Sequence, residues 1–125
     1  MIGYVTLGTR DLQKAAQFYD ALLAELDGKR MMEMETFIAW GTDPAKPMLG
    51  VIKPYDGKEA TVGNGVMVGI PADSPETVNR VYEKAIALGA ADEGAAGPRG
   101  DSFYAGYFRD MDGNKLAVFC IPQAS

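Results

Sequence analysis

Hydrophobic positions repeat with a helical period in two segments of the chain. In the first, Asp11 precedes the repeat and Gly28 follows it. The apolar positions between them are Leu12, Ala15, Ala16, Tyr19, Leu22, Leu23 and Leu26. Aspartate is a favourable N-cap and glycine a common residue after a helix, so this spacing predicts a helix. A second helix is predicted from Ser74-Pro75, an N-cap followed by proline at the first helical position, to Gly89.

The remaining apolar segments favour strands, because they are short, rich in β-branched and aromatic residues, and bounded by turn residues. We expect four strands in each half of the chain. They cover residues 2–8, 29–33, 36–41 and 48–53, and then 65–70, a short piece near 91, 103–109 and 115–121. Residues 94–102, GAAGPRGDS, are expected to form a loop, and a tight turn at Asp112-Gly113 joins the last two strands.

The two halves are related by an internal repeat. An offset of 63 residues places Tyr4 on Met67 and Tyr19 on Tyr82, so one register spans a strand and the helix after it. We therefore expect one βαβββ unit to be used twice within a single domain. The first module covers about residues 1–54, the link 55–62, and the second module about 63–125.

Composition limits the classes of function. No segment of the 125 residues approaches the roughly 20 apolar residues of a membrane span, and the first strand follows Met1 without a signal peptide. A net charge of −5 without a basic stripe argues against nucleic acid as a partner. The single Cys120 lies in an apolar strand, which predicts a core residue in a reducing compartment. We expect a cytoplasmic protein that binds a small molecule and no membrane.

Several features together resemble the vicinal oxygen chelate superfamily of glyoxalases, bleomycin-resistance proteins and dioxygenases. They are the opening IGYVTLG strand, the D-L-x-x-A-x-x-F-Y helix after it, the repeat, and the D-x-D-G-N turn at residues 110–114. The resemblance covers essentially the whole chain. It implies an α+β fold whose two tandem βαβββ modules form an eight-stranded open mixed barrel with flanking helices, in a homodimer. In enzymes of this superfamily, the opening strand and a later strand of each module hold a divalent metal.

The metal positions that the resemblance implies carry no usual ligands here. The histidines of the family fall on Tyr4 and Met67, and its closing glutamate falls on Ala117. The fourth ligand would come from residues 47–52, a segment without His, Glu, Asp or Gln whose register the sequence does not fix. Zinc, iron and nickel sites depend on imidazole or thiolate, whereas this chain has no histidine and one cysteine. We therefore predict no metal and no other cofactor.

Alternation along the strands predicts which side chains line the cavity. Tyr4, Thr6, Met67, Ala117 and Phe119 are expected there, while Val5, Leu7, Val68, Ile70, Leu116, Val118 and Cys120 face the helices. Trp40, as a pocket wall or dimer contact, Tyr104, and Arg99, on a candidate lid at residues 94–102, complete the predicted ligand-binding set. An aromatic and apolar strip of this kind suits a flat organic molecule.

The sequence therefore predicts a metal-independent protein of the glyoxalase and bleomycin-resistance type that binds a small aromatic or apolar molecule without changing it. One alternative is an enzyme, such as a lyase or isomerase, that works without the usual metal. Tyr4 or Tyr104 would transfer a proton and Arg99 would hold an anion, although a tyrosine needs a strong perturbation to act near neutral pH. The other alternative is a dimeric protein whose cavity is filled.

Overall fold

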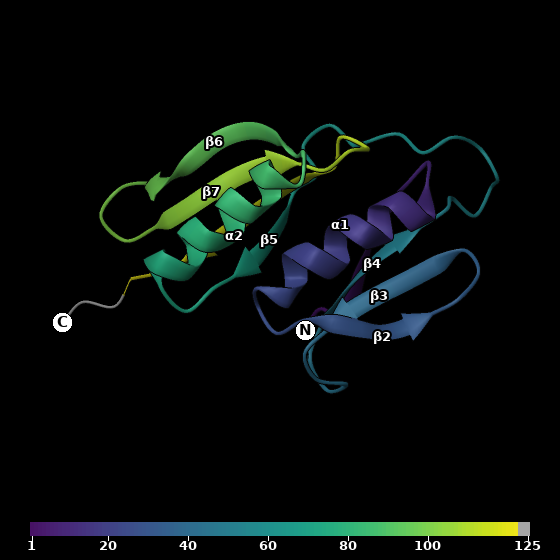
Figure 1. The fold of residues 1–125 in the computed structure, drawn as a ribbon, viewed down its shortest axis with the longest axis horizontal. Helices are drawn as coiled ribbons and strands as arrows, with labels where there is room; N and C mark the ends of the chain where they lie inside the picture. Colours follow the sequence, from purple (N-terminus) through teal and green to yellow (C-terminus); the bar gives the residue numbers. More distant parts are fainter. Residues whose placement is uncertain (123–125) are drawn as a thin grey trace. The chain divides into compact units, whose positions relative to one another are not determined.

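The computed structural model describes residues 1–122 and divides into two compact units, Met1–Val62 and Gly63–Ser125. Each unit contains one βαβββ module (Figure 1). Module 1 comprises β1 (Tyr4–Gly8), α1 (Leu12–Ala24), β2 (Lys29–Glu33), β3 (Phe37–Gly41) and β4 (Met48–Ile52). Module 2 comprises β5 (Val68–Pro71), α2 (Pro75–Ala87), β6 (Ala91–Pro98), β7 (Tyr104–Arg109) and β8 (Lys115–Cys120). The predicted α+β fold with two βαβββ modules is confirmed.

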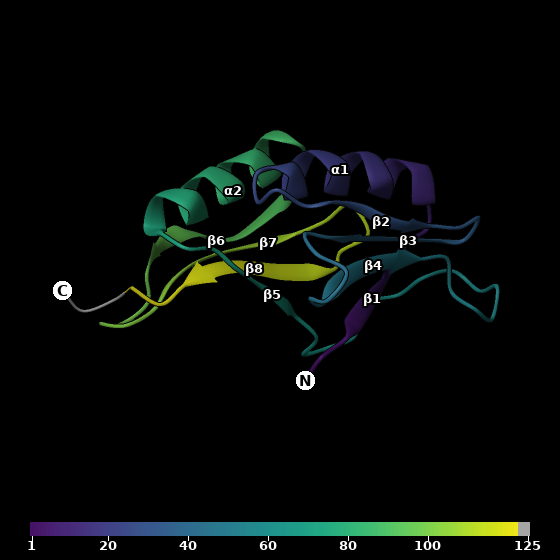
Figure 2. The ribbon, with the colours of Figure 1, turned by 90° about the horizontal axis from the view of Figure 1, so that it is seen from below.

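Each module forms a four-stranded mixed sheet with the same pairing. The strand orders are β1-β4-β3-β2 and β5-β8-β7-β6, with the first strand parallel to the last and the other neighbours antiparallel. The helix of each module covers one face of its sheet (Figure 2). We call the opposite side the open face. The union of the two sheets in an eight-stranded barrel stays a prediction.

The open faces follow from strand alternation and register. In module 1 the open face carries Tyr4, Thr6, Phe37, Met48 and Ile52. In module 2 it carries Gly69, Tyr107, Lys115, Ala117 and Phe119.

The core of each module lies between its helix and its sheet. Core side chains that are at most 1% exposed include Leu22, Ile38, Val51, Val78, Val81 and Val118. Along β8 the predicted alternation is confirmed, since Leu116, Val118 and Cys120 are buried and Phe119 is half-buried on the opposite side. Burial raises the pKa of the Cys120 thiol, with smaller contributions from Glu76 and Asp73. These properties agree with the core role expected for this cysteine.

Both predicted N-caps are present. The Asp11 side chain accepts a hydrogen bond from the Lys14 backbone N–H at 3.1 Å, and Ser74 Oγ accepts one from the Thr77 N–H at 3.2 Å. Gly89, directly after the α2 C-cap, has a φ of +104°, which explains the glycine there. No helix among residues 1–122 is long and apolar enough to cross a membrane.

The end of α1 differs from the expected glycine cap. Asp27, with a φ of +60°, adopts the left-handed conformation in place of Gly28. The Gly28 N–H donates to the Leu23 carbonyl at 2.8 Å, and a Cβ at Gly28 would lie 3.0 Å from that oxygen. The glycine is needed for close approach to the helix, and aspartate is among the residues that tolerate the left-handed region.

The expected loop at residues 94–102 is a further correction, because β6 extends from Ala91 to Pro98. It pairs with β7 through two register shifts, one on each side of Gly94. Gly94 has a φ of +152°, which few side chains allow. The glycine- and alanine-rich segment lacks a strand pattern, so its pairing with β7 overrides a weak local preference.

Candidate functional site

Strand register indicates which residue falls on the fourth metal position that the resemblance implies. Thr6 pairs with Gly50, and Gly69 pairs with Ala117. Thr6 and Gly69 are counterparts under the 63-residue offset, since 6 + 63 = 69. Gly50 is therefore the module 1 counterpart of Ala117.

The four positions do not fit a divalent metal. Tyr4 offers a phenol and Met67 a thioether, while Ala117 offers a methyl group and Gly50 no side chain. Protein sites for such ions are built from imidazole, thiolate or several converging oxygens. Among the described residues, no group of three or more His, Cys, Asp or Glu side chains is arranged to hold a metal ion.

An aromatic ring occupies the space beside Gly50 on the open face of module 1. A Cβ at Gly50 would lie 2.5 Å from Phe37 Cε1 and 2.9 Å from its Cζ. Met31 and Met48 approach the neighbouring Gly41 in the same way, with Cγ atoms 3.3 and 3.0 Å from the position of a Cβ. Rings and thioethers thus form this face where ligands of a metal would be expected.

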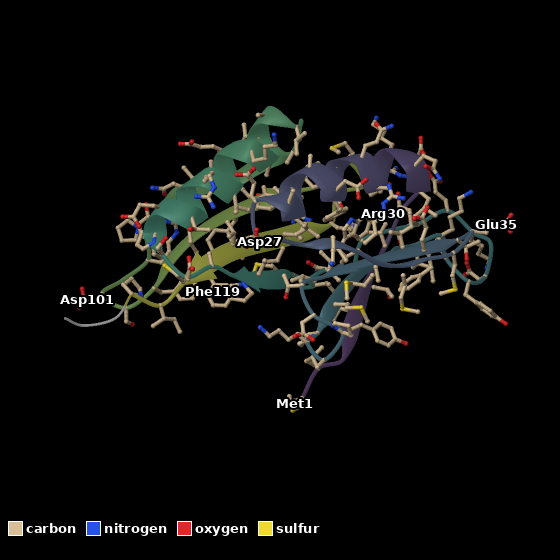
Figure 3. The ribbon with its side chains drawn as sticks, turned by 60° about the horizontal axis from the view of Figure 1, so that its bottom comes forward. Met1, Asp27, Arg30, Glu35, Asp101 and Phe119 are labelled. Carbon is tan, nitrogen blue, oxygen red and sulfur yellow. The ribbon has the colours of Figure 1, made fainter. Side chains whose placement is uncertain are left out.

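On the open face of module 2, apolar side chains surround a small residue. Ala117 is 2% exposed and pairs with Gly69 on one side and Tyr107 on the other. The Phe119 ring stacks on Phe103 with centroids 5.5 Å apart and planes at 22°. Figure 3 shows Phe119 on the side of its sheet away from α2.

Two cations lie over the ring of Tyr107. Arg99 Cζ is 5.4 Å and Lys115 Nζ is 5.7 Å from the ring centroid. Sequence reasoning selected Arg99 but missed Tyr107, Lys115 and Phe103. Tyr107 could have been found from the sequence, because aligning the two strands of the β7–β8 hairpin places it directly opposite Ala117.

Arg99, directly after β6, folds back on that strand. Its Nη1 donates to the carbonyls of Gly97 at 2.9 Å and Pro98 at 3.2 Å, and its Nη2 donates to that of Ala95 at 2.7 Å. The side chain expected on a mobile lid is therefore held against β6, with the guanidinium beside Tyr107.

Trp40 and Tyr104 lie on the helix-covered faces, apart from the other predicted site residues. Trp40 is 1% exposed, and its Nε1–H donates to Asp20 Oδ1 at 2.8 Å. The Tyr104 hydroxyl donates to Asn79 Oδ1 on α2 at 2.7 Å. Strand register gives the reason, since Trp40 pairs with Leu49 and Tyr104 with Cys120, two residues on the helix side of their sheets. The structure places Tyr4, Thr6, Ala117 and Phe119 on open faces and exposes Met67 just before β5, while their role in lining one cavity stays a prediction.

Asp20 joins α1 to the edge of the module 1 sheet. Arg30 donates to both carboxylate oxygens of Asp20, from Nε at 2.9 Å and from Nη2 at 2.7 Å. Its Nη1 also lies 3.0 Å from Glu33 Oε2. The hydrogen bonds from Arg30 lower the pKa of Asp20, which burial opposes and the Trp40 bond reinforces. These contacts give the buried Trp40 a structural role.

The matched tyrosines of the repeat both lie on the helix side of their sheets. Tyr19 is fully buried, and the centroid of its ring lies 5.6 Å from that of the Trp40 ring. Tyr82 lies against Gly106, where a Cβ would be 2.9 Å from Tyr82 Cδ1, and its hydroxyl donates to Asp92 at 2.7 Å. Burial, and then the Asp92 carboxylate, raise the pKa of Tyr82. Neither ring lies on an open face.

Module 1 also contains a separate open cavity of about 440 Å³. It is lined by Thr9, Arg10, Lys53, Pro54 and residues 57–60. Arg10 Nη1 lies 3.7 Å from Glu59 Oε1 within it. None of the predicted site residues lines this cavity.

Comparisons with known proteins agree with the fold. The sequence model of the Glyoxalase/Bleomycin resistance protein/Dioxygenase superfamily matches residues 1–118. A glyoxalase/bleomycin resistance protein from Albidiferax ferrireducens T118 is 34% identical in sequence. Its structure superposes with a TM-score of 0.90 and covers 98% of this chain and 99% of its own.

More distant solved structures share the fold. An enzyme of the glyoxalase/bleomycin resistance protein/dioxygenase family from Burkholderia phytofirmans PsJN is 18% identical, with a TM-score of 0.77 over 96% of this chain and 98% of its own. A lactoylglutathione lyase from Agrobacterium tumefaciens is 19% identical, with a TM-score of 0.70 over 96% and 92%. No protein of curated function matches the chain. The match over residues 1–118 and the full-length relative show that the chain belongs to the Glyoxalase/Bleomycin resistance protein/Dioxygenase superfamily.

Proposed function

We propose that this chain is a metal-independent binding protein for a small organic molecule with an aromatic or apolar body. The observation that carries the proposal is the chemistry of the four positions where the superfamily holds its metal. Tyr4, Gly50, Met67 and Ala117 supply no imidazole, thiolate or carboxylate. Without such donors, these residues cannot hold the metal ion on which the Lewis-acid catalysis of the metal-dependent enzymes relies.

The open face of module 2 offers the contacts that such a molecule needs. Gly69 carries no side chain, and Tyr107 and Phe119 present partly exposed rings on the same face. A Cβ at Gly69 would lie 3.3 Å from Phe119 Cε1, so this ring lies close to the glycine. Flat ligands bind such surfaces by stacking and by burial of apolar area. Ala117, buried beneath its neighbours, contributes less contact than the sequence suggested.

Names of relatives do not decide between binding and catalysis. The 34% identical protein is described as both a glyoxalase and a bleomycin resistance protein. An enzyme without a metal would need another acid or base at the site. Tyr104, one of the two tyrosines considered for proton transfer, donates its hydroxyl proton to Asn79 on the helix side. This placement favours binding.

The proposal is tested by screening a library of aromatic fragments against the metal-free protein by thermal shift and NMR. We expect a ligand that raises Tm and is recovered chemically unchanged. Tyr107→Ala should weaken its binding by about fivefold, the effect of losing one ring contact of roughly 1 kcal/mol. Tyr55→Ala is the matched control, because Tyr55 is fully exposed in the link.

Two results would contradict the proposal. Conversion of the ligand to a product would support the enzyme alternative. Absence of any ligand across the library, with a correctly folded protein, would support the alternative in which the cavity is filled.

A further inference from the structure

Three positive side chains, Arg99, Arg109 and Lys115, lie at the open face of module 2, although the chain has a net charge of −5. Arg109 on this face pairs with Glu93 and also donates to the Gly113 carbonyl at 2.8 Å. Arg99 and Lys115 have no such carboxylate partner within the described residues. Their ring contacts with Tyr107 place both charges beside one aromatic side chain.

Two glycines of β6 make room for the side chain of Arg99. A Cβ at Gly94 would lie 3.3 Å from Arg99 Nη2 and 3.2 Å from Tyr107 Cδ2, and one at Gly97 would lie 3.4 Å from Arg99 Nη1. The two glycines therefore make room for the guanidinium on the strand. Because it is already ordered, the side chain loses little further freedom when a ligand binds.

Arg99 also retains hydrogen-bonding capacity. A guanidinium has five N–H donors, and the three backbone carbonyls of residues 95, 97 and 98 account for three of them. These carbonyls orient the group but carry no net charge. Two N–H donors and a full positive charge remain for a further acceptor.

We propose that the ligand of this face is an aromatic carboxylate, with its carboxylate at Arg99, its ring near Tyr107 and Phe119, and Lys115 adding a second positive charge beside Tyr107. The inference rests on the proposed function and adds the class of ligand. A ligand that covers the face removes water from two cations, which costs free energy unless an anion replaces that water. A planar carboxylate suits the guanidinium and forms charge-assisted hydrogen bonds with it.

The test is a protein-observed NMR titration with matched pairs of probes, 2-naphthoate with 2-naphthamide and indole-3-acetate with indole-3-acetamide. Each acid should bind at least about tenfold more tightly than its amide, and 0.5 M NaCl should reduce this preference. Arg99→Gln and Lys115→Gln should each weaken acid binding by about fivefold and leave amide binding unchanged. Lys14→Gln on α1 makes the same charge change in module 1 and should have no effect.

The outcomes separate this inference from the proposed function. Equal binding of acids and amides at the open face would overturn the carboxylate assignment but leave small-molecule binding in place. A preference for acids that survives both substitutions would also overturn it. If neither acids nor amides shift the signals of Tyr107, Phe119 or their neighbours, the inference and the proposed function both fail.

Discussion

At the scale of single residues, Gly50 shows how a missing side chain shapes an open face. Its counterpart in module 2 is Ala117, where a metal ligand is expected from the superfamily. The sequence identified Ala117 from its distance to the D-x-D-G-N turn. It did not identify Gly50, because the register of β4 depends on pairing with β1, which no local pattern encodes.

We predict that Gly50→Ala destabilises module 1 by about 1–3 kcal/mol, because the new methyl group overlaps the Phe37 ring. Urea unfolding measures the loss. Gly3→Ala, with no atom within 4 Å of the new Cβ, should be nearly neutral. In a Phe37→Leu background the cost of Gly50→Ala should fall, and equal costs in both backgrounds would contradict the steric explanation.

A second residue-scale prediction concerns Asp20. Its pKa is lowered from 3.8, so the carboxylate contributes stability above that pH, and this contribution is lost as the pH falls through the lowered value. Asp20→Asn should cost about 1–2 kcal/mol near pH 6, a range reduced for partial exposure of the ion pair.

The measurement is urea unfolding of both proteins at pH 6 and pH 2.5. The difference in free energy of unfolding should be smaller at the lower pH. Asp101→Asn, an exposed change in the turn after β6, should show no such dependence. A difference that does not vary with pH would show that the charge of Asp20 is unimportant.

At the scale of elements, the β7–β8 hairpin decides which residues share a face. The turn was evident from the sequence, but Tyr104 was chosen for the site although it has the wrong parity. Antiparallel pairing places Tyr107 opposite Ala117 and Tyr104 opposite Cys120, a buried residue. The alignment of the two hairpin strands therefore indicates Tyr107, and not Tyr104, as the aromatic residue on the open face.

Asp110 organises this hairpin turn. Its Oδ1 accepts hydrogen bonds from the backbone N–H groups of Asp112 and Asn114 at 2.9 Å each, and Oδ2 accepts one from Asn114 Nδ2 at 3.1 Å. We predict that Asp110→Ala lowers the free energy of unfolding by about 2–3 kcal/mol, since these buried donors lose their acceptor. Asp110→Asn keeps one acceptor oxygen and should lose less. Thermal unfolding compares the two variants, and equal Tm values would contradict this role.

The sequence predicts correctly the elements that are marked by local signals, such as the helix N-caps. It does not predict the strand whose formation depends on pairing with a neighbouring strand. The caps Asp11 and Ser74 fixed the helix starts, because a side-chain acceptor at the N-cap is a local interaction. Beyond the short strand predicted near residue 91, the part of β6 from residue 94 is expected from the sequence to be a loop, since its glycines and alanines carry little strand preference of their own. Its contacts with β7 supply what the local sequence lacks.

At the scale of the whole molecule, membership of the superfamily and the loss of its ligand chemistry must be explained together. Both modules keep the strand order and helix of the family, and the 34% identical relative covers almost the whole chain. The scaffold is thus retained while the four metal positions carry a phenol, a thioether, a methyl group and no side chain. A binding role uses the scaffold without requiring a metal.

The most direct test of this account is isothermal titration of the protein with 2-naphthoate after dialysis against EDTA, and again with one equivalent of nickel, zinc or iron(II). Metal analysis of the purified protein accompanies it. The account predicts no stoichiometric metal, a Kd that is the same in all samples, and 2-naphthoate recovered unchanged. Binding or turnover that appears only when a stoichiometric metal ion is present would contradict it.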